Sequence, residues 1–344
     1  MDRIAKPPPR LVRAWLPALA GSVALALVGC LAVVAPPAEA GGNPWIVRDP
    51  LNIAHQGGED EFPSNTLYAY RRAVRGGADM LELDIGVTKD GKVVVMHDTT
   101  VNRTTNGRGP IATKTLKQIK RLDAAYWFSK EGPDHYEHGL PRRAYRFRGI
   151  ATKKKRPPKG FKPRDFRVPT LRQVLRAFPH KPINIEIKGR TKQEEDAEYV
   201  KNAEVLARFL RGVNRDDLIV ASFRQPALDR FHELLPRFGL SPGTVGSTNW
   251  FFGGSPGPGV VVLQLPMTYE LGDQLLELAT NDNIARAHRD GYGWHSWFGG
   301  DDRDAPASWA TLIGYCVDGI MTSRSTKLEK VLRSHPAPTS CPGN

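Results

Sequence analysis

Short apolar runs alternate with longer amphipathic patterns over most of this 344-residue chain, and this alternation limits the possible folds more than any other feature. Several runs are almost continuously apolar, as expected for parallel strands that are buried on both faces. Eight such runs with helical patterns between them predict an α/β fold, a closed (β/α)8 TIM barrel. The predicted strands are residues 51–55, 80–87, 93–97, 183–187, 218–223, 260–265, 292–298 and 319–322, with residues 244–246 as an alternative to the sixth. The clearest predicted helices are residues 66–75, 171–177, 194–211 and 225–235.

Residues 124–168 interrupt this pattern after the third predicted strand, since they show no helical periodicity. The segment that begins at Arg142 and ends at Arg167 has twelve Lys or Arg residues and one acidic residue. The whole chain has a net charge of +13, so this segment carries most of the excess. Loops that follow barrel strands lie on the face that carries TIM-barrel active sites. We therefore predict a basic insertion that overhangs the mouth of an active site.

The first forty residues have the features of an export signal. Arg10 and Arg13 precede an almost unbroken apolar stretch, and small residues follow at Ala38 and Ala40. This predicts a signal peptide over residues 1–40 and a mature domain over residues 41–344. Cys30 ends a lipobox-like sequence, so lipidation there is one alternative and an uncleaved membrane anchor is another. All three interpretations place the folded domain outside the cytoplasmic membrane, either secreted or attached to the cell surface.

The mature domain contains two cysteines, Cys316 and Cys341. In an oxidising compartment they can form one disulfide that ties the C-terminal tail to the barrel. Two unpaired thiols are the alternative, because a sequence fixes no distance between the two residues.

Three carboxylates lie at equivalent places in two predicted strands. Glu82 and Asp84 alternate with Leu81, Leu83 and Ile85, so they share one face of a buried strand. Two carboxylates in such a place repel each other unless a positive charge lies between them, and a hard divalent cation is the usual solution. Glu186 and Lys188 share a face of a later strand in the same way, although a simple ion pair also explains them. Together the two strands predict a metal site.

Two histidines end predicted strands on either side of this pair. His55 leads into Gln56-Gly57-Gly58, and His97 precedes Asp98. Active sites of TIM barrels form at the carboxyl ends of the strands. Two histidines beside a cation provide the acid and the base that phosphodiester cleavage requires: one activates the attacking oxygen and the other protonates the leaving alcohol.

A dense series of motifs occupies the first part of the mature domain. The motifs are His55-Gln56-Gly57, Pro63-Ser64-Asn65-Thr66-Leu67, Gly77 to Asp84, Thr88-Lys89-Asp90-Gly91, His97-Asp98 and Arg103-Thr104-Thr105-Asn106-Gly107. This series resembles the N-terminal signature of the glycerophosphodiester phosphodiesterase family. Further matches come from Val168-Pro169-Thr170-Leu171, from Asn184 to Lys188, and from Val317 to Thr322, so the resemblance extends over residues 52–332 without the basic insertion.

The resemblance implies a TIM barrel that hydrolyses glycerophosphodiesters to glycerol 3-phosphate and an alcohol. It implies that His55 and His97 are the acid and the base, with their individual roles open. It also implies one divalent cation, Ca²⁺ or Mg²⁺, with ligands that the resemblance transfers to Glu82, Asp84 and Glu186, and a phosphate contact for Lys188.

Some positions differ from the family pattern, and these differences predict an altered choice of substrate. Gln56 stands where the family has arginine, so this position keeps a hydrogen bond to phosphate but lacks a charge. Ser64 replaces a glutamate, and Trp297 replaces a polar residue. Trp294 is expected to line the glycerol pocket. Thr322-Ser323-Arg324-Ser325 stands where Thr-Asp-x-Pro is usual.

Other functions remain open from the sequence. A related phospholipase D-type activity on lysolipids or sphingolipids is the enzymatic alternative, and an inactive barrel that binds anionic wall or membrane polymers is the other. The basic segment 142–167 suits an anionic membrane or cell-wall surface, whereas nucleic acid is not expected because few aromatic residues are interleaved with the charges. His135 and His138 would provide a second metal site, with a solvated loop as the simpler interpretation.

Overall fold

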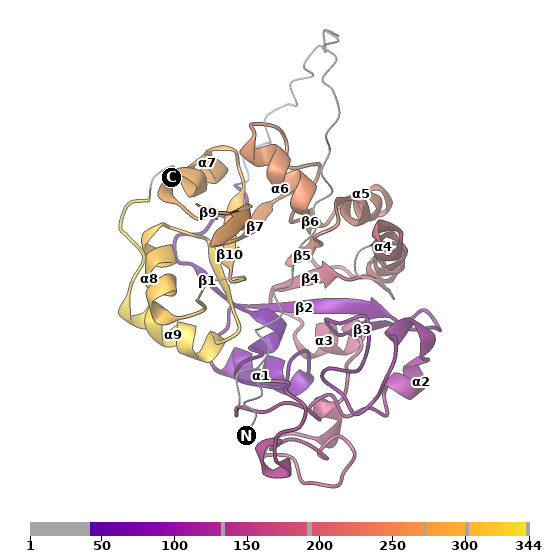
Figure 1. Ribbon diagram of the computed structural model, residues 1–344. Helices are drawn as coiled ribbons and strands as arrows, with labels where there is room; N and C mark the ends of the chain where they lie inside the picture. Colours follow the sequence, from indigo (N-terminus) through magenta and orange to yellow (C-terminus); the bar gives the residue numbers. More distant parts are fainter. Residues whose placement is uncertain (1–41, 132–134, 191–194, 272, 300–302, 342–344) are drawn as a thin grey trace, which may run out of the picture. The chain divides into compact units, whose positions relative to one another are not determined.

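A computed structural model describes residues 42–131, 135–190, 195–271, 273–299 and 303–341. Eight of the strands in this part of the chain are parallel and form one nearly closed barrel with helices outside it (Figure 1). The barrel closes where Leu240 pairs with Val260 in parallel. In order around the barrel, the strands are β6 (Gly239–Leu240), β5 (Leu218–Ala221), β4 (Ile183–Ile187), β2 (Met80–Val87), β1 (Leu51–Ala54), β11 (Gly319–Thr322), β10 (Gly293–Trp297) and β7 (Val262–Pro266).

The predicted TIM barrel is confirmed, but one predicted strand lies outside it and one of its eight strands was not predicted. The third predicted strand, residues 93–97, contains β3 (Val93–Val95), which pairs antiparallel with β2 and lies outside the barrel. Only five residues separate β2 from β3, and a parallel crossover needs a dozen or more. The missing barrel strand is β6, whose two residues are too few to give a periodic pattern. Residues 244–246, the alternative sixth strand, belong to helix α6.

The barrel interior is apolar at one end and acidic towards the other. Ile53, Met80, Ile219, Val262 and Met321, from five different strands, form one buried cluster inside it. Side chains of a strand alternate between its faces, so Glu82 and Asp84 point into the barrel as Met80 does. Trp45 joins the apolar cluster, and its ring meets that of His295 edge to face.

The helices bury their apolar faces against the outer side of the barrel in two large clusters. The four predicted helices at residues 66–75, 171–177, 194–211 and 225–235 are confirmed within two residues. The helices are α1 (Leu67–Arg75), α2 (Leu116–Ile119), α3 (Leu171–Ala177), α4 (Asp196–Leu210), α5 (Gln225–Leu234), α6 (Thr244–Phe251), α7 (Asn281–Arg289), α8 (Pro306–Gly314) and α9 (Ser325–Ser334). A separate hairpin pairs β8 (Thr268–Leu271) with β9 (Gln274–Glu277).

The segment 124–168 lies between α2 and α3, in the long connection from β2 to β4. Its described residues include two short 3₁₀ helices, η3 (Arg142–Ala144) and η4 (Pro163–Phe166), and no α-helix or strand. Phe161 and Phe166 pack against Tyr68 of α1, and Asp165 is paired with Arg71 of the same helix at 2.7 Å. The second half of the segment is therefore fixed to the outer surface of α1.

Cys316 and Cys341 form a disulfide, with 5.8 Å between their Cα atoms. This is the first of the two alternatives from the sequence, and it ties the segment after α9 to the turn between α8 and β11. The predicted signal peptide at residues 1–40, including Cys30, lies outside the described residues. Within the described part of the chain, no helix combines the length and the apolar character that a membrane span requires.

Candidate active site

The three predicted carboxylates converge where β2 pairs with the carboxyl end of β4. Asp84 and Glu186 are paired in register across the two strands, and Glu82 lies two residues earlier on the same face as Asp84. One carboxylate oxygen from each of the three residues lies within 4.8 Å of the other two. Glu82 and Asp84 are buried. The strand register thus creates the convergence that alternation in the sequence predicted.

Lys188 lies directly beside this cluster. Its Nζ is 2.5 Å from Glu186 Oε1 and 3.3 Å from Asp84 Oδ1. Burial disfavours the charged ammonium group, but the two carboxylates outweigh this effect and raise the pKa of Lys188. The ion-pair interpretation of Glu186 and Lys188 is therefore correct as geometry. It does not exclude a metal site, because three ionised carboxylates and one ammonium group leave two negative charges.

The cluster fits a hard divalent cation. Burial, followed by repulsion from Asp84, raises the pKa of Glu82 well above its usual value, so charge on this carboxylate is costly without a nearby positive ion. Its Oε1 is buried and has no hydrogen-bond partner among the described residues. The donors are all carboxylate oxygens, which Ca²⁺ and Mg²⁺ prefer. No other group of three such ligands occurs in the described segments.

Two loop residues hold the carboxylates from outside. The backbone N–H of Gln56 donates to Glu82 Oε2 at 2.8 Å, and Asn65 Nδ2 donates to Asp84 Oδ2 at 2.9 Å. Tyr70 OH in turn donates to Asn65 Oδ1 at 2.7 Å. Gln56 and Asn65 have φ values of +50° and +54°. Asn65 was part of a recognised motif in the sequence, but its contact with Asp84 depends on this turn and was not predicted.

Gln56 supports the site through its backbone in addition to any contact with substrate. Its side chain is buried, and its Oε1 accepts a hydrogen bond from Asn65 Nδ2 at 3.2 Å. The prediction that Gln56 contacts the substrate phosphate thus stays a prediction. Arg324, in the segment that replaces Thr-Asp-x-Pro, donates to Asp60 Oδ2 and to the carbonyl of Asp304.

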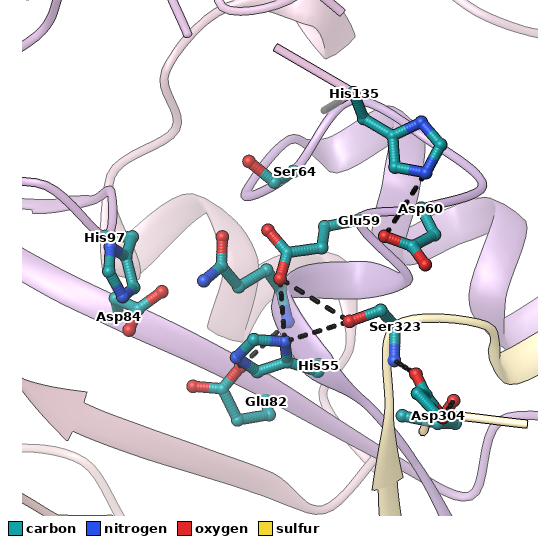
Figure 2. A network of polar contacts seen from close by, with 12 residues as sticks. His55, Glu59, Asp60, Ser64, Glu82, Asp84, His97, His135, Asp304 and Ser323 are labelled. Atoms are coloured by element: carbon teal, nitrogen blue, oxygen red, sulfur yellow. Dashed lines mark hydrogen bonds and ion pairs between the residues drawn. The ribbon is translucent and has the colours of Figure 1, made fainter. Parts of the chain in front are cut away.

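His55 follows β1 and faces the carboxylates (Figure 2). Its Nδ1 lies 2.9 Å from Glu59 Oε1, and its Nε2 lies 3.9 Å from Glu82 Oε2. Burial opposes protonation of this imidazole. The Glu59 carboxylate and, to a smaller degree, Glu82 and Asp84 outweigh burial and raise the pKa of His55 to about 10. A cation bound at the carboxylates would oppose this rise.

His97 lies on the other side of the site (Figure 2), where a similar contact holds its ring. Its Nδ1 is 2.8 Å from Asp98 Oδ1, and Arg103 binds the same carboxylate through two nitrogens. Burial alone would raise the pKa of Asp98, but the bonds to His97 and Arg103 hold it well below its usual range. Both predicted histidines are therefore oriented through Nδ1, which leaves Nε2 of each ring for chemistry.

The prediction that Trp294 lines the substrate pocket is wrong. Trp294 is fully buried on the outer face of β10, where its ring packs against Trp250 and its Nε1 donates to Ser296 Oγ at 2.9 Å. Trp297, three residues later, lies on the opposite face of the strand. Its ring meets that of Phe223 edge to face, and Phe223 is 49% exposed. Since Lys188 Nζ is 5.6 Å from the centre of the Phe223 ring, this aromatic pair borders the site.

His135 and His138 do not form a second metal site together. His135 Nε2 lies 3.4 Å from Asp60, and its Nδ1 lies 2.9 Å from the carbonyl of Ser129. The ring of His138 stacks on Trp127. These contacts fix the first half of the insertion near the loop that follows β1.

Comparison with known proteins agrees with this arrangement. A profile of the "Glycerophosphoryl diester phosphodiesterase family" matches residues 55–327. The chain belongs to this family. The chain is 32% identical to a glycerophosphodiester phosphodiesterase from Bacillus subtilis over 188 residues. This segment is 54% of this chain and 56% of the relative. A second relative with the same description, from Caldanaerobacter subterraneus, is 51% identical over 81 residues, or 24% of this chain and 33% of the relative. Across eight curated relatives, the matched segment spans 22% to 64% of the relative's length.

Solved structures show the same fold. A glycerophosphodiester phosphodiesterase from Agrobacterium tumefaciens superposes with a TM-score of 0.56 at 23% identity, over 80% of this chain and 98% of that protein. A phosphodiesterase from Oleispira antarctica, solved with sn-glycerol-3-phosphate, gives a TM-score of 0.55 at 19% identity, over 82% of this chain and 96% of that protein. At these identities the similarity supports the barrel fold alone.

Proposed function

We propose that this protein is an exported hydrolase that cleaves glycerophosphodiesters to glycerol 3-phosphate and an alcohol with the help of one divalent cation. The observation that carries the proposal is the convergence of Glu82, Asp84 and Glu186 between two histidines. Membership of the family and the names of its relatives support the same reaction.

Glu82, Asp84 and Glu186 would hold the cation, either Ca²⁺ or Mg²⁺. When bound, the cation neutralises charge on the oxygens of the phosphodiester. Asn65 and the backbone of Gln56 keep two of the carboxylates in place through the hydrogen bonds described above. Lys188 would contact a phosphate oxygen while it remains paired with Glu186.

The two imidazoles perform the proton transfers. Nε2 of one ring accepts a proton from the attacking water, and Nε2 of the other donates a proton to the alcohol that leaves. Glu59 and Asp98 occupy the Nδ1 positions, so neither ring can turn its other nitrogen to the substrate without losing a hydrogen bond. The exposed Phe223 and the half-buried Trp297 give the site an apolar border on which the non-polar part of a substrate can pack.

Export and surface binding are separate parts of the proposal. The leader at residues 1–40 supports export, whether it is cleaved after Ala40 or lipidated at Cys30. The disulfide between Cys316 and Cys341 is consistent with an oxidising compartment. Exposed basic residues of the segment 142–167, including Lys154, Lys155 and Lys159, would bring the enzyme to an anionic membrane or wall polymer.

Product analysis tests the reaction. Purified protein with added Ca²⁺ or Mg²⁺ is incubated with glycerophosphocholine and, separately, with lysophosphatidylcholine. The proposal predicts glycerol 3-phosphate and choline from the first substrate, with a loss of at least about 100-fold in kcat for His55→Ala. Lysophosphatidic acid as the main product would instead establish the phospholipase D-type reaction. A folded, metal-loaded protein that releases no product from either substrate would leave the binding role.

A further inference from the structure

We infer that Glu59, in the loop after β1, is the positioning residue that holds the ring of His55. Residue 323, at the end of β11, is a second position from which the same ring nitrogen can be held. This inference rests on the proposed function, because it concerns the histidine that acts in that reaction. It adds a residue that belongs to none of the motifs identified in the sequence.

The contact is direct and close. Glu59 Oε1 lies 2.9 Å from His55 Nδ1, and the side chains are 20% and 31% exposed (Figure 2). Because Nδ1 is occupied, Nε2 faces Glu82 Oε2 at 3.9 Å. A carboxylate on one nitrogen of an imidazole fixes the ring orientation and determines which nitrogen is presented to a reactant. Asp98 makes the same kind of contact with His97, at 2.8 Å.

The loop that carries Glu59 is held firmly from both sides. Gly58 N–H donates to the carbonyl of His55 at 2.8 Å, and Asp60 N–H donates to the carbonyl of Ser323 at 3.1 Å. Asp60 also accepts from Arg324, and Glu61 accepts from the backbone N–H of Thr326 at 2.9 Å. Three consecutive acidic residues thus have different partners. Asp60 and Glu61 attach the loop to the end of β11 and the start of α9, and this leaves Glu59 pointing at His55.

Ser323 occupies a second position from which His55 can be held. Its Oγ lies 3.3 Å from His55 Nδ1 and 3.5 Å from Glu59 Oε1. A carboxylate at residue 323 would therefore reach the same ring nitrogen, but in this chain the residue is serine. Glu59 supplies the negative charge that the serine lacks. The two positions are alternatives for one function, so a carboxylate at 323 should replace the one at 59.

Steady-state kinetics with glycerophosphocholine and saturating metal ion provide the first test. Glu59→Ala is expected to lower kcat by about 10- to 100-fold, with KM within about twofold of the wild-type value, because the change affects orientation and not binding. Glu59→Gln keeps an acceptor for Nδ1–H but not the negative charge, so it should recover part of this loss. Glu59→Ala combined with Ser323→Asp should recover at least about tenfold relative to Glu59→Ala alone.

Glu233→Ala is the matched control, since this glutamate is 64% exposed on α5 and pairs with Arg230 at 3.0 Å. Its kcat should equal that of the wild type. The inference fails if Glu59→Ala has a wild-type kcat, if the loss lies in KM alone, or if Ser323→Asp gives no recovery in the Glu59→Ala background.

A measurement without turnover separates this inference from the proposed reaction. In ¹H–¹⁵N spectra of histidine-labelled protein, the Nδ1 proton of His55 is assigned with His55→Gln. A low-field, slowly exchanging resonance is expected in the wild type and in Glu59→Gln, and its loss or upfield shift is expected in Glu59→Ala. If the wild type releases no glycerol 3-phosphate but the resonance depends on Glu59, the reaction is wrong and the positioning is right. An unchanged resonance in Glu59→Ala overturns the inference.

Discussion

At the scale of single residues, this site depends on groups that support the carboxylates and histidines from behind. Asn65 illustrates the point, because its amide donates to Asp84 and accepts from Tyr70. Its φ of +54° lies in the left-handed region, where Asn and Gly are tolerated better than other residues. The amide and the backbone angle together determine where Asp84 is held.

Replacing Asn65 with glycine should weaken metal binding. Asn65→Gly keeps the backbone conformation available but removes the hydrogen bond to Asp84, so we expect a loss of about 10- to 100-fold in affinity for Ca²⁺ or Mg²⁺ by calorimetry. Lys153→Gly is the control, since Lys153 also has a positive φ, of +64°, and is exposed far from the carboxylates in sequence. Equal affinities for both variants would show that the amide does not support the site.

His295 provides a prediction on pH. It is buried inside the barrel, and burial lowers its pKa to about 3, against 6.5 for an unperturbed histidine. Between these values the unfolded chain binds a proton that the folded protein does not bind. The free energy of unfolding should therefore fall as the pH decreases from about 6.5 towards 3, by at most about 1.4 kcal/mol per pH unit from this group.

Urea unfolding at pH 7 and pH 5 checks this prediction. The loss of stability between the two values should be smaller by about 1–2 kcal/mol in His295→Gln than in the wild type. His335→Gln, at an exposed position, should behave as the wild type does. A wild-type pH dependence in His295→Gln would contradict the account of this residue.

At the scale of elements, the start of α1 connects stability to the site. Thr66 is fully buried at the N-cap of this helix, where its Oγ1 accepts from Ala69 N–H at 3.1 Å and donates to the carbonyl of Pro63 at 2.7 Å. It directly follows Asn65, so the cap fixes the turn that presents the amide to Asp84.

Thr66→Ala should lower the free energy of unfolding by about 1–2 kcal/mol, because it removes the capping hydroxyl group and a buried methyl group. Thr248→Ala, at an exposed position within α6, should cost less than about 0.5 kcal/mol. Denaturant unfolding measures both values. The cap has no special role if the two variants lose equal stability.

The strands also show which parts of the site the sequence was sufficient to predict. Glu82, Asp84 and Glu186 were predictable because alternation in a strand assigns side chains to faces, whatever the register. The same rule did not show which of Trp294 and Trp297 faces the substrate site, since both faces of a barrel strand are buried and neither is marked by polarity. The contact between Glu59 and His55 was missed because it depends on the path of a loop, for which the sequence has no periodic signal.

At the scale of the whole molecule, the basic segment 142–167 lies on the outer side of α1, where Phe161 packs on Tyr68.

Strand alternation predicted the barrel but counted β3 in place of β6. A two-residue strand such as β6 is recognised only by its pairing with neighbouring strands. The antiparallel direction of β3 follows from the five residues that connect it to β2. Closure of the barrel is thus a property of the assembled strands.

Neutralising four exposed basic residues tests the surface function. Lys154, Lys155, Arg156 and Lys159 changed to Gln should weaken binding to vesicles with anionic lipids at least tenfold, since each charge contributes about 1 kcal/mol near such a surface. The control changes four exposed basic residues elsewhere to Gln: Arg176, Lys201, Arg208 and Arg211. Vesicle sedimentation at low and high salt measures binding. An equal loss in both variants would indicate attraction by net charge alone.

The central claim is that the three carboxylates hold a cation that hydrolysis requires. The most direct test is the rate of glycerol 3-phosphate release from glycerophosphocholine after treatment with EDTA and after return of Ca²⁺ or Mg²⁺. We expect EDTA to abolish release, one of the two ions to restore it in the wild type, and neither to restore it in Glu82→Ala. Full activity in EDTA, or wild-type activity in Glu82→Ala, would contradict the account.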